Sequence, residues 1–290
     1  MSGEFGFDYR SAQRAVLVAL EEDMDFGDIT TDSVFKTAQS TTAKIVAKEP
    51  GIIAGLPIIG LVFSCMGNND VSLELCVTEG ERVQKNQQIA LLTGDIRTLL
   101  SAERTLLNFL QRLSGIATIT NEYVQVASPF GVEICDTRKT VPGLRYLDKY
   151  AVRVGGGMNH RFNLSDAVLI KDNHISGAGS IAEAVRRVKN TVSFTKKIEV
   201  EVKNLEEVKE AMECEVDVIL LDNMSALMMS EAVRLIKKQN SNVLVEASGN
   251  VTLERIPEIA QTGVDVVSVG SLTHSVKALD ISMYVKTDNT

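Results

Sequence analysis

The sequence predicts an α/β protein whose second half forms a closed or nearly closed β/α barrel. Six short apolar runs recur after about residue 130, and stretches with helical character lie between several of them. Continuous apolar runs are typical of strands that are buried on both faces, and helical crossovers place such strands in a parallel sheet. The number and close spacing of the runs favour a barrel over an open doubly wound sheet. The runs are GVEICDTR, AVLIKDNH, KIEVEV, DVILLDN, VLVEASGN and DVVSVGS.

The first part of the chain mixes helices with short strands. Segment 9–23 has the periodicity of an amphipathic helix, and segment 97–117 predicts a long helix with leucines on one face. Runs rich in β-forming residues occupy 41–49 and 71–77. Segment 79–95 predicts hairpin-linked strands, because glycines punctuate it. The regular alternation of apolar runs and helical stretches starts only at the first of the six runs. The chain therefore has two parts with different secondary-structure patterns.

Composition excludes several classes of function. At 290 residues the chain is long enough for one large domain or two ordinary domains. The net charge of -8 argues against general binding to nucleic acid or to an anionic membrane, which needs a broad basic surface. The longest apolar run starts at Gly51 and is interrupted by glycines and by Pro57, so we expect a buried core segment there rather than a membrane span.

The cysteines indicate a reducing compartment. Cys65, Cys76, Cys135 and Cys214 are scattered, without a CxxC pair or a histidine at ligand spacing. This pattern suggests reduced thiols and gives no support to a zinc site. No signal peptide is visible in the charged N-terminal stretch. We therefore expect a cytoplasmic protein, with a nuclear location also open.

Polar residues follow each of the six apolar runs. Because the carboxyl ends of barrel strands converge on one mouth, these groups should face one another. The earlier ends supply cations, which bind carboxylates, and the later ends supply carboxylates and Gly/Ser turns, which suit Mg²⁺ and phosphate. The mouth therefore predicts two anionic ligands, a small polycarboxylate and a phosphorylated partner with Mg²⁺. The end residues are Asp136, Arg138, Lys139, Lys171, Asp172, Glu199, Glu201, Asp222, Asn223, Glu246, Ser248, Gly249, Ser268, Gly270 and Ser271.

Each polar group also has an ordinary structural interpretation. An Asp-Asn pair after a strand is often only a turn or a helix cap. Arg145, Lys149 and Arg153 recur at helical spacing, and we assign Lys149 and Arg153 to a solvated helix face. His174 and His274 are interpreted as ordinary hydrogen-bonded histidines. Turns and helix caps alone are less able to explain why polar residues follow all six apolar runs.

Long motifs in the sequence match a known family. The longest begins at Asp136 and reads DTRKTVPGLRYLDKYAVRVGGGMNHRFNLSDAVLIKDNH, and shorter ones are EDMDFGDITT, AERTLLNFLQRLSGIAT, EVEV, LLDNM, EASGN and GVDVVSVGSLTHS. Almost end to end, the chain resembles the quinolinate phosphoribosyltransferases. The resemblance implies transfer of phosphoribose from phosphoribosyl pyrophosphate to quinolinate with decarboxylation. The implied products are nicotinate mononucleotide, pyrophosphate and CO₂, in de novo NAD biosynthesis.

The resemblance also implies an architecture. It predicts an N-terminal open α/β sandwich domain over residues 1–115 and a β/α barrel with fewer than eight strands over residues 116–275. Residues 276–290 would form a C-terminal segment that packs back on the N-terminal domain. The implied assembly is a homodimer with shared active sites, or a higher homo-oligomer, that uses Mg²⁺ as its cofactor and has neither nucleic acid nor membrane as a partner.

Site residues follow from the same resemblance. Arg104 corresponds to the arginine that reaches into the partner subunit's site, and Glu201 and Asp222 match the acidic positions near the ribose and the metal. The implied catalytic residues are Glu201, Asp222, Lys139 and Lys171. The residues implied to surround the substrate carboxylates and phosphates are Arg138, Lys139, Thr140, His160, Arg161 and Lys171. The implied phosphate-holding turns are Ser248, Gly249 and Asn250, and Gly270, Ser271 and Leu272.

Two other functions remain open on the residues alone. A Schiff-base aldolase could use Lys139 or Lys171 as its amine nucleophile. Arginines crowd both lysines, however, and such a lysine is usually desolvated. A non-catalytic anion-binding barrel is the second alternative, and the presence of Glu201 and Asp222 argues against it.

Overall fold

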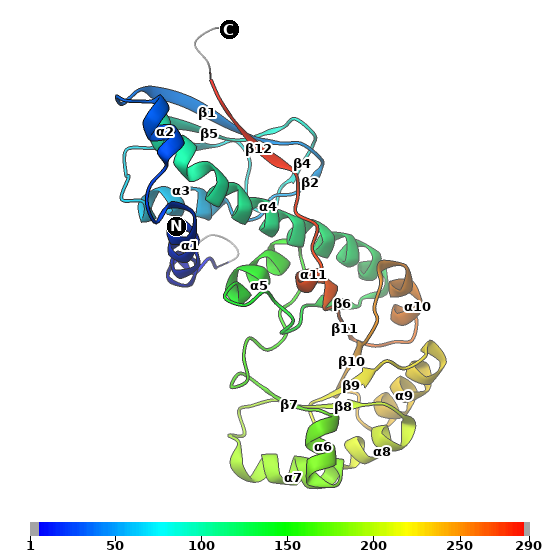
Figure 1. Ribbon diagram of the computed structural model, residues 1–290. Helices are drawn as coiled ribbons and strands as arrows, with labels where there is room; N and C mark the ends of the chain where they lie inside the picture. The colour runs from blue at the N-terminus through cyan, green and yellow to red at the C-terminus, as the bar shows by residue number, and fades with distance from the viewer. Residues whose placement is uncertain (1–5, 287–290) are drawn as a thin grey trace. The chain divides into compact units, whose positions relative to one another are not determined.

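The computed structural model describes residues 6–286, which form two compact units (Figure 1). The N-terminal unit comprises residues 6–121, 140–156 and 272–286, and the barrel unit comprises residues 122–139 and 157–271. These units differ from the contiguous domains expected from the sequence. The expected boundary at 115/116 lies inside one helix of 32 residues, α4 (Ile96–Ala127). Two later segments also pack with the N-terminal residues, so the N-terminal unit is discontinuous in sequence.

The N-terminal unit contains an antiparallel four-stranded sheet in the order β12-β1-β5-β3 and a small β2-β4 pair. Its strands are β1 (Ser40–Ala47), β2 (Gly51–Ile52), β3 (Ser72–Leu75), β4 (Arg82–Val83), β5 (Gln88–Asp95) and β12 (Ile281–Val285). Its helices are α1 (Tyr9–Met24), α2 (Ile29–Val34), α3 (Leu56–Cys65), most of α4, α5 (Arg145–Val154) and most of α11 (Ser271–His274). The hairpin expected within 79–95 is wrong, because β4 pairs with β2 whereas β5 pairs with β1 and β3.

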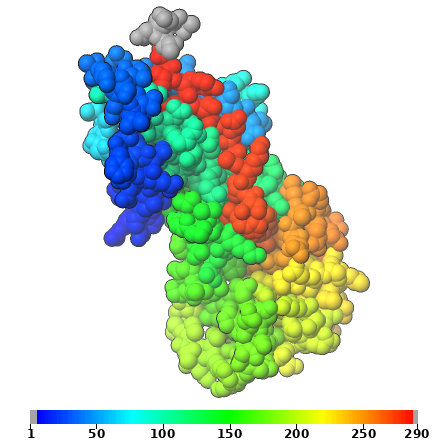
Figure 2. Space-filling view, in the orientation of Figure 1, coloured from blue at the N-terminus to red at the C-terminus, as the bar shows by residue number. Residues whose placement is uncertain are grey.

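The C-terminal segment returns to this unit as its edge strand. Strand β12 runs antiparallel to β1, with Ile45 opposite Met283, and lies on the surface of the unit, where it is red in Figure 2. Residues 287–290 of the expected C-terminal segment lie outside the described residues. The last strand of the sheet is therefore supplied by the end of the chain.

Helix α5 corrects one expectation about charge. Lys149 is only 1% exposed, so the expected solvated face is wrong for this residue, whereas Arg153 is exposed. The neighbouring Asp148 is fully buried, and its carboxylate accepts hydrogen bonds from Arg112 at 2.9 and 2.8 Å. Lys149 is buried because segment 140–156 packs within the N-terminal unit on all sides of this turn of the helix, which helical periodicity cannot reveal.

The barrel unit is built on a six-stranded parallel sheet in the order β6-β11-β10-β9-β8-β7. Each of the six apolar runs forms one strand. They are β6 (Glu133–Cys135), β7 (Val168–Ile170), β8 (Ile198–Val202), β9 (Val218–Asp222), β10 (Leu244–Ser248) and β11 (Val266–Ser268). Strands β6 and β7 end the sheet, and no ladder joins them within residues 6–286. The expected barrel with fewer than eight strands is confirmed, and it remains open at this seam.

Helices follow the strands around the outside of the barrel unit, as Figure 1 shows for α7, α8 and α9. The helices of the unit are α6 (Asp172–Ala178), α7 (Ile181–Thr191), α8 (Leu205–Glu213), α9 (Ala226–Gln239) and α10 (Ile256–Ala260), with short 3-10 turns at Ser128–Phe130 and Leu253–Arg255. Strand β8 is buried at all five positions although it carries Glu199 and Glu201. Two buried carboxylates in one strand are costly unless they are paired, so they point to a functional site.

The described part of the chain contains no helix that is long and apolar enough to cross a membrane. The segment around Pro57, which was expected to be core, forms α3, in which Ile58, Ile59 and Val62 are almost completely buried. Within residues 6–286 no disulfide links the four cysteines, as expected for reduced thiols.

Candidate active site

A polar cavity of about 530 Å³ opens at the carboxyl ends of the barrel strands. Its volume lies within the range of small-molecule sites, and its position is the one at which barrel enzymes carry their active sites. All of its lining residues belong to the barrel unit. They are Thr137, Arg138, Lys139, His160, Arg161, Leu169, Lys171, Glu201, Leu220, Asp222, Asn223, Glu246, Ser248, Gly249, Asn250 and Ser268.

Most of the residues implied by the resemblance lie on this lining, and five do not. Arg104 is exposed on α4 in the N-terminal unit. Thr140 also belongs to that unit, and its hydroxyl accepts a hydrogen bond from Arg145 Nε at 3.1 Å. The turn after β11 does not line the cavity either, and Leu272 is completely buried. That turn consists of Gly270, Ser271 and Leu272.

Other lining residues had been given no individual role in binding or catalysis. Asn223, Glu246 and Ser268 stand at ends of apolar runs, so the same strand-end pattern contained them. Thr137 sits between Asp136 and Arg138, two residues that the pattern did select. Nothing in the sequence distinguishes the lining residues Leu169 and Leu220 from ordinary core residues, because both are apolar residues within strands.

Cations and carboxylates are balanced around the cavity. Four basic residues, Arg138, Lys139, Arg161 and Lys171, line it together with three acidic ones, Glu201, Asp222 and Glu246. The Lys171 Nζ atom lies 2.5 Å from Glu201 Oε2, which makes this lysine a paired ammonium group. Its side chain is 45% exposed. A Schiff-base nucleophile needs a desolvated neutral amine, so this geometry disfavours an aldolase that uses Lys171.

Buried Asp136 holds the loop that carries His160 and Arg161. The Asp136 carboxylate is fully buried and accepts hydrogen bonds from the backbone N–H of His160 at 2.9 Å and from Asn159 Nδ2 at 2.6 Å. A single parallel bridge between Cys135 and Met158 joins the same loop to the end of β6. Asp136 therefore positions cationic residues of the cavity and does not line it.

Arg161 lies in an unfavourable environment for a cation. Burial lowers the pKa of Arg161, and the nearby guanidinium of Arg138 lowers it further. Its Nη1 atom donates to the carbonyl of Ala167 at 3.0 Å, which fixes the direction of the side chain. Two neighbouring guanidinium groups in a partly buried site repel each other, and an anionic ligand would relieve that repulsion.

His160, which lines the cavity, contacts two buried carboxylates. Its Nε2 atom lies 3.2 Å from Glu199 Oε2 and 3.5 Å from Glu246 Oε2, whereas its Nδ1 atom accepts the backbone N–H of Arg161 at 2.8 Å. Burial disfavours a charge on His160, whereas its hydrogen bonds with Glu199 and Glu246 favour the charge and raise the pKa of His160. The N–H donor at Nδ1 opposes a second ring proton, and burial raises the pKa of Glu199. A neutral imidazole in this geometry carries its ring proton on Nε2, which lies beside both carboxylates.

This assignment bears on metal binding. His160, Glu199 and Glu246 are the one group of three potential ligands that lie close together in the part of the chain that the structure describes. A histidine that binds a metal through Nε2 normally donates its Nδ1–H to another group. Here Nδ1 accepts a hydrogen bond, so Nε2 carries the proton and has no free lone pair for a metal. The cluster is therefore better described as a hydrogen-bonded carboxylate pair around an imidazole.

Two hydrogen-bonded side-chain amides orient Asp222 at the other side of the cavity. Asn223 Nδ2 donates to Asp222 Oδ1 at 3.1 Å, and Asn250 Nδ2 donates to Asn223 Oδ1 at 3.1 Å. Asn223 and Asn250 both have positive φ, at 53° and 47°. Gly249 has φ 97°, and a Cβ atom there would lie 2.3 Å from Asn223 Oδ1. Positive φ angles in non-glycine residues concentrate at functional sites, which agrees with this location.

Comparison with known protein families decides the assignment. Residues 28–114 match the model for the N-terminal domain of quinolinate phosphoribosyl transferase, and residues 116–284 match the model for its C-terminal domain. The chain belongs to the quinolinate phosphoribosyl transferase family. The family predicted from the sequence motifs is thereby confirmed.

Individual members of the family agree. The chain is 48% identical to a probable nicotinate-nucleotide pyrophosphorylase (carboxylating) of Bacillus subtilis, over 92% of this chain and 91% of that protein. It is 45% identical to the protein of the same name from Synechocystis, over 92% of this chain and 90% of that protein. The structure of the nicotinate-nucleotide pyrophosphorylase from Francisella tularensis superimposes with a TM-score of 0.91 at 40% identity, covering 97% of this chain and 98% of the other.

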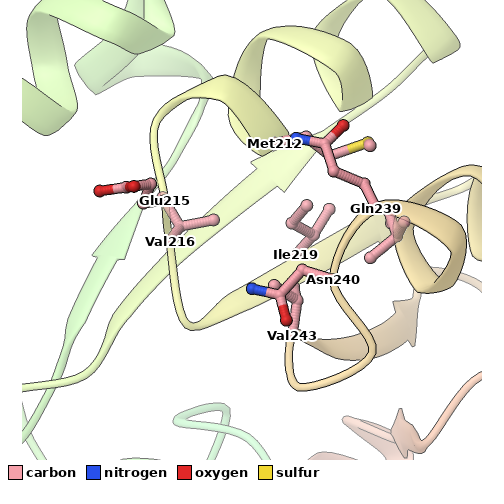
Figure 3. A pocket seen from close by; sticks show the side chains of 8 residues that line it. Met212, Glu215, Val216, Ile219, Gln239, Asn240 and Val243 are labelled. Carbon is pink, nitrogen blue, oxygen red and sulfur yellow. The ribbon is translucent and has the colours of Figure 1, made fainter.

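A second cavity of about 220 Å³ lies at the other ends of the barrel strands (Figure 3). It is formed where α8 leads into β9 and α9 leads into β10, and its wall includes the buried Ile219 and Ile236. In Figure 3 the carboxylate of Glu215 points away from the other lining side chains. This cavity lacks convergent charged groups, so it does not compete with the polar cavity as the active site of this family member.

Proposed function

We propose that this chain transfers phosphoribose from phosphoribosyl pyrophosphate to quinolinate and removes one carboxylate, giving nicotinate mononucleotide, pyrophosphate and CO₂ in de novo NAD biosynthesis. The observation that carries the proposal is the polar cavity itself, which combines neighbouring guanidinium groups with strand-end carboxylates and a glycine turn. Membership of the quinolinate phosphoribosyl transferase family supports the same reaction.

Quinolinate binds at the cationic side of the cavity. Arg138 and Arg161 are the groups best suited to its carboxylates, because guanidinium groups bind carboxylates through two parallel hydrogen bonds. Their mutual repulsion, which burial strengthens, supports this role. Lys139 and Lys171 add positive charge for the carboxylates and for the phosphates.

Phosphoribosyl pyrophosphate binds at the opposite side. Ser248, Gly249 and Asn250 form a turn on the cavity wall, where a glycine lets backbone N–H groups approach a phosphate closely. The turn of Gly270, Ser271 and Leu272 follows the next strand, β11, and we assign it to phosphate binding from the sequence resemblance alone.

Mg²⁺ is the expected cofactor, and the carboxylates of Glu201 and Asp222 fit it. Both line the cavity from the ends of neighbouring strands, and each offers the oxygen ligands that Mg²⁺ prefers. When bound, Mg²⁺ would neutralise charge on the departing pyrophosphate. Lys171 pairs with Glu201 Oε2 at 2.5 Å, so Oε1 is the oxygen through which Glu201 would bind a metal while this ion pair persists.

The chemistry follows from these charges. The ribose carbon gains cationic character as pyrophosphate leaves, and the Glu201 carboxylate stabilises it while the pyridine nitrogen attacks. The alkylated nitrogen is positively charged and stabilises the electron pair that remains when the adjacent carboxylate departs as CO₂. The ring is its own electron sink, so the reaction needs no activated serine or cysteine.

Assembly as a homodimer with shared sites completes the proposal. Arg104 is exposed on α4 and belongs to the N-terminal unit, whereas all lining residues of the cavity belong to the barrel unit. A two-fold dimer presents the same surface of each subunit to the other, so Arg104 would serve the partner's cavity. A cytoplasmic location agrees with cysteines that form no disulfide within residues 6–286.

Pyrophosphate release tests the proposed function directly. The purified chain with phosphoribosyl pyrophosphate and quinolinate should release pyrophosphate and CO₂ in equal amounts, and should release neither with nicotinate in place of quinolinate. Absence of pyrophosphate with quinolinate would favour a non-catalytic anion-binding barrel instead.

A further inference from the structure

The buried residue Glu246 is a carboxylate that the proposed transfer step does not use. It is 4% exposed, it lies on strand β10, and it lines the active-site cavity. Its Oε2 atom lies 3.5 Å from His160 Nε2, and its Oε1 atom is buried without a hydrogen-bond partner in residues 6–286. A buried carboxylate oxygen without a partner is costly, so its presence in a cavity wall points to a function with a ligand.

Strand register separates Glu246 on β10 from Glu201 on β8 by one strand. Leu220 on β9 lies opposite Glu246 on one side and opposite Glu201 on the other. The apolar side chain of Leu220 also lines the cavity and is 5% exposed. Glu246 is therefore on the part of the wall that also holds His160, and the apolar surface beside it limits screening of its charge.

We propose that Glu246 acts on the decarboxylation step, as a fixed negative charge that repels the carboxylate that quinolinate loses. The proposal rests on the proposed function of the cavity. In the bound nucleotide the bond from the ring carbon to its carboxylate breaks, and CO₂ leaves. The electron pair stays on the ring carbon beside the positively charged nitrogen, and water then supplies the proton that forms the new C–H bond.

The repulsion favours this step because the charge disappears during it. The substrate carboxylate carries a full negative charge before the bond breaks and none as CO₂, so a neighbouring carboxylate destabilises the bound nucleotide more than the transition state. The substrate carboxylate keeps its charge during phosphoribosyl transfer, so this repulsion does not drive that step. Glu246 thereby counters Arg138 and Arg161, which would otherwise hold the leaving carboxylate in place.

Single-turnover measurements with Glu246→Gln test the proposal. Pyrophosphate and CO₂ are quantified from the same quenched samples, with phosphoribosyl pyrophosphate and carboxyl-labelled quinolinate as substrates. Pyrophosphate release should slow far less than CO₂ release, which should fall about 100-fold if the two charges are about 6 Å apart at an effective dielectric constant of about 20. The phosphoribosylated diacid should accumulate, and quinolinate should bind at least as tightly as in the unaltered protein.

Glu199→Gln is the matched control. Glu199 contacts the same His160 nitrogen at 3.2 Å and is equally buried, but it is not part of the cavity wall. If Glu246 acts only by holding His160, the two variants should behave alike. Under the proposal, CO₂ release in Glu199→Gln keeps pace with pyrophosphate release, even if both are slower.

Equal slowing of pyrophosphate and CO₂ in Glu246→Gln, or no slowing of either, would overturn the proposal. If that variant does not fold, Glu246→Asp serves instead. It keeps the charge but withdraws it by one methylene, and it should slow CO₂ release several-fold more than pyrophosphate release. A failure of the function itself is distinguishable, because the unaltered protein would then release no pyrophosphate with quinolinate.

Discussion

Replacement of Gly249 by alanine should damage catalysis without a matching loss of stability. Two costs arise from the structure. The backbone conformation at φ 97° is disfavoured for an L-residue by about 1–2 kcal/mol. The new Cβ would also lie 2.3 Å from Asn223 Oδ1, which is impossible without movement. Asn223 is exposed, so its side chain can swing into solvent at little cost in folding free energy.

The displacement of the Asn223 side chain should lower the catalytic rate rather than the stability. When Asn223 swings out, Asp222 loses the hydrogen bond that Asn223 Nδ2 donates to it at 3.1 Å. A hydrogen bond to a charged group contributes about 1.5–3 kcal/mol, so kcat/KM for phosphoribosyl pyrophosphate should fall about 10- to 100-fold. Quinolinate affinity, measured by calorimetry, should change much less.

Gly179→Ala is the matched control for this prediction. Gly179 has φ 102°, and a Cβ atom there would meet nothing within 4 Å. Both variants should lose about 1–2 kcal/mol in denaturant unfolding, and only Gly249→Ala should lose activity. Asn223→Gly should reproduce the kinetic loss, because it removes the amide without creating strain at a residue with φ 53°. Full activity in Asn223→Gly would refute the assignment of Asn223 as the residue that positions Asp222.

Three further predictions concern ligands and assembly. Arg161→Ala should weaken quinolinate binding by about 2–5 kcal/mol in calorimetry, as expected when one partner of a desolvated charge pair is removed, and an unchanged Kd with lower turnover would contradict this role. Asp222→Ala should raise KM for phosphoribosyl pyrophosphate more than KM for quinolinate, and full activity in excess chelator would rule out a requirement for Mg²⁺. Arg104→Ala and Lys171→Ala should each be nearly inactive, yet mixed and allowed to exchange subunits they should recover roughly a quarter of normal activity, because half of the dimers are mixed and each has one intact site. No recovery despite demonstrated exchange would mean that Arg104 acts within its own subunit or only in folding.

Local sequence patterns were sufficient to predict the strands of the barrel. Each of the six apolar runs became one strand of the parallel sheet, because a strand covered on both faces must be apolar along its length. Polar residues at the run ends, such as Asp222 and Ser248, reached one cavity for a related reason, since parallel strands place their carboxyl ends on the same side. Sequence motifs also identified the family, and with it the reaction.

Contacts between distant segments could not be predicted from the sequence. Helical spacing assigned Lys149 to solvent, but segment 140–156 packs within the N-terminal unit and buries it. Glycine punctuation predicted a hairpin, but β4 pairs with β2 instead. In both cases the local pattern was compatible with more than one partner, and only packing selected between them.

The sequence by itself determined which residues stand at strand ends, and therefore which charges the cavity could contain. Tertiary structure decided how those charges meet. Glu199 and Glu246 come from strands separated by β9, and they converge on His160 only because buried Asp136 holds the loop that carries it. The physical reason is that alternation along a strand specifies only which face a side chain occupies. Distances between charges, which set their interaction energies, depend on how loops and non-adjacent strands pack together.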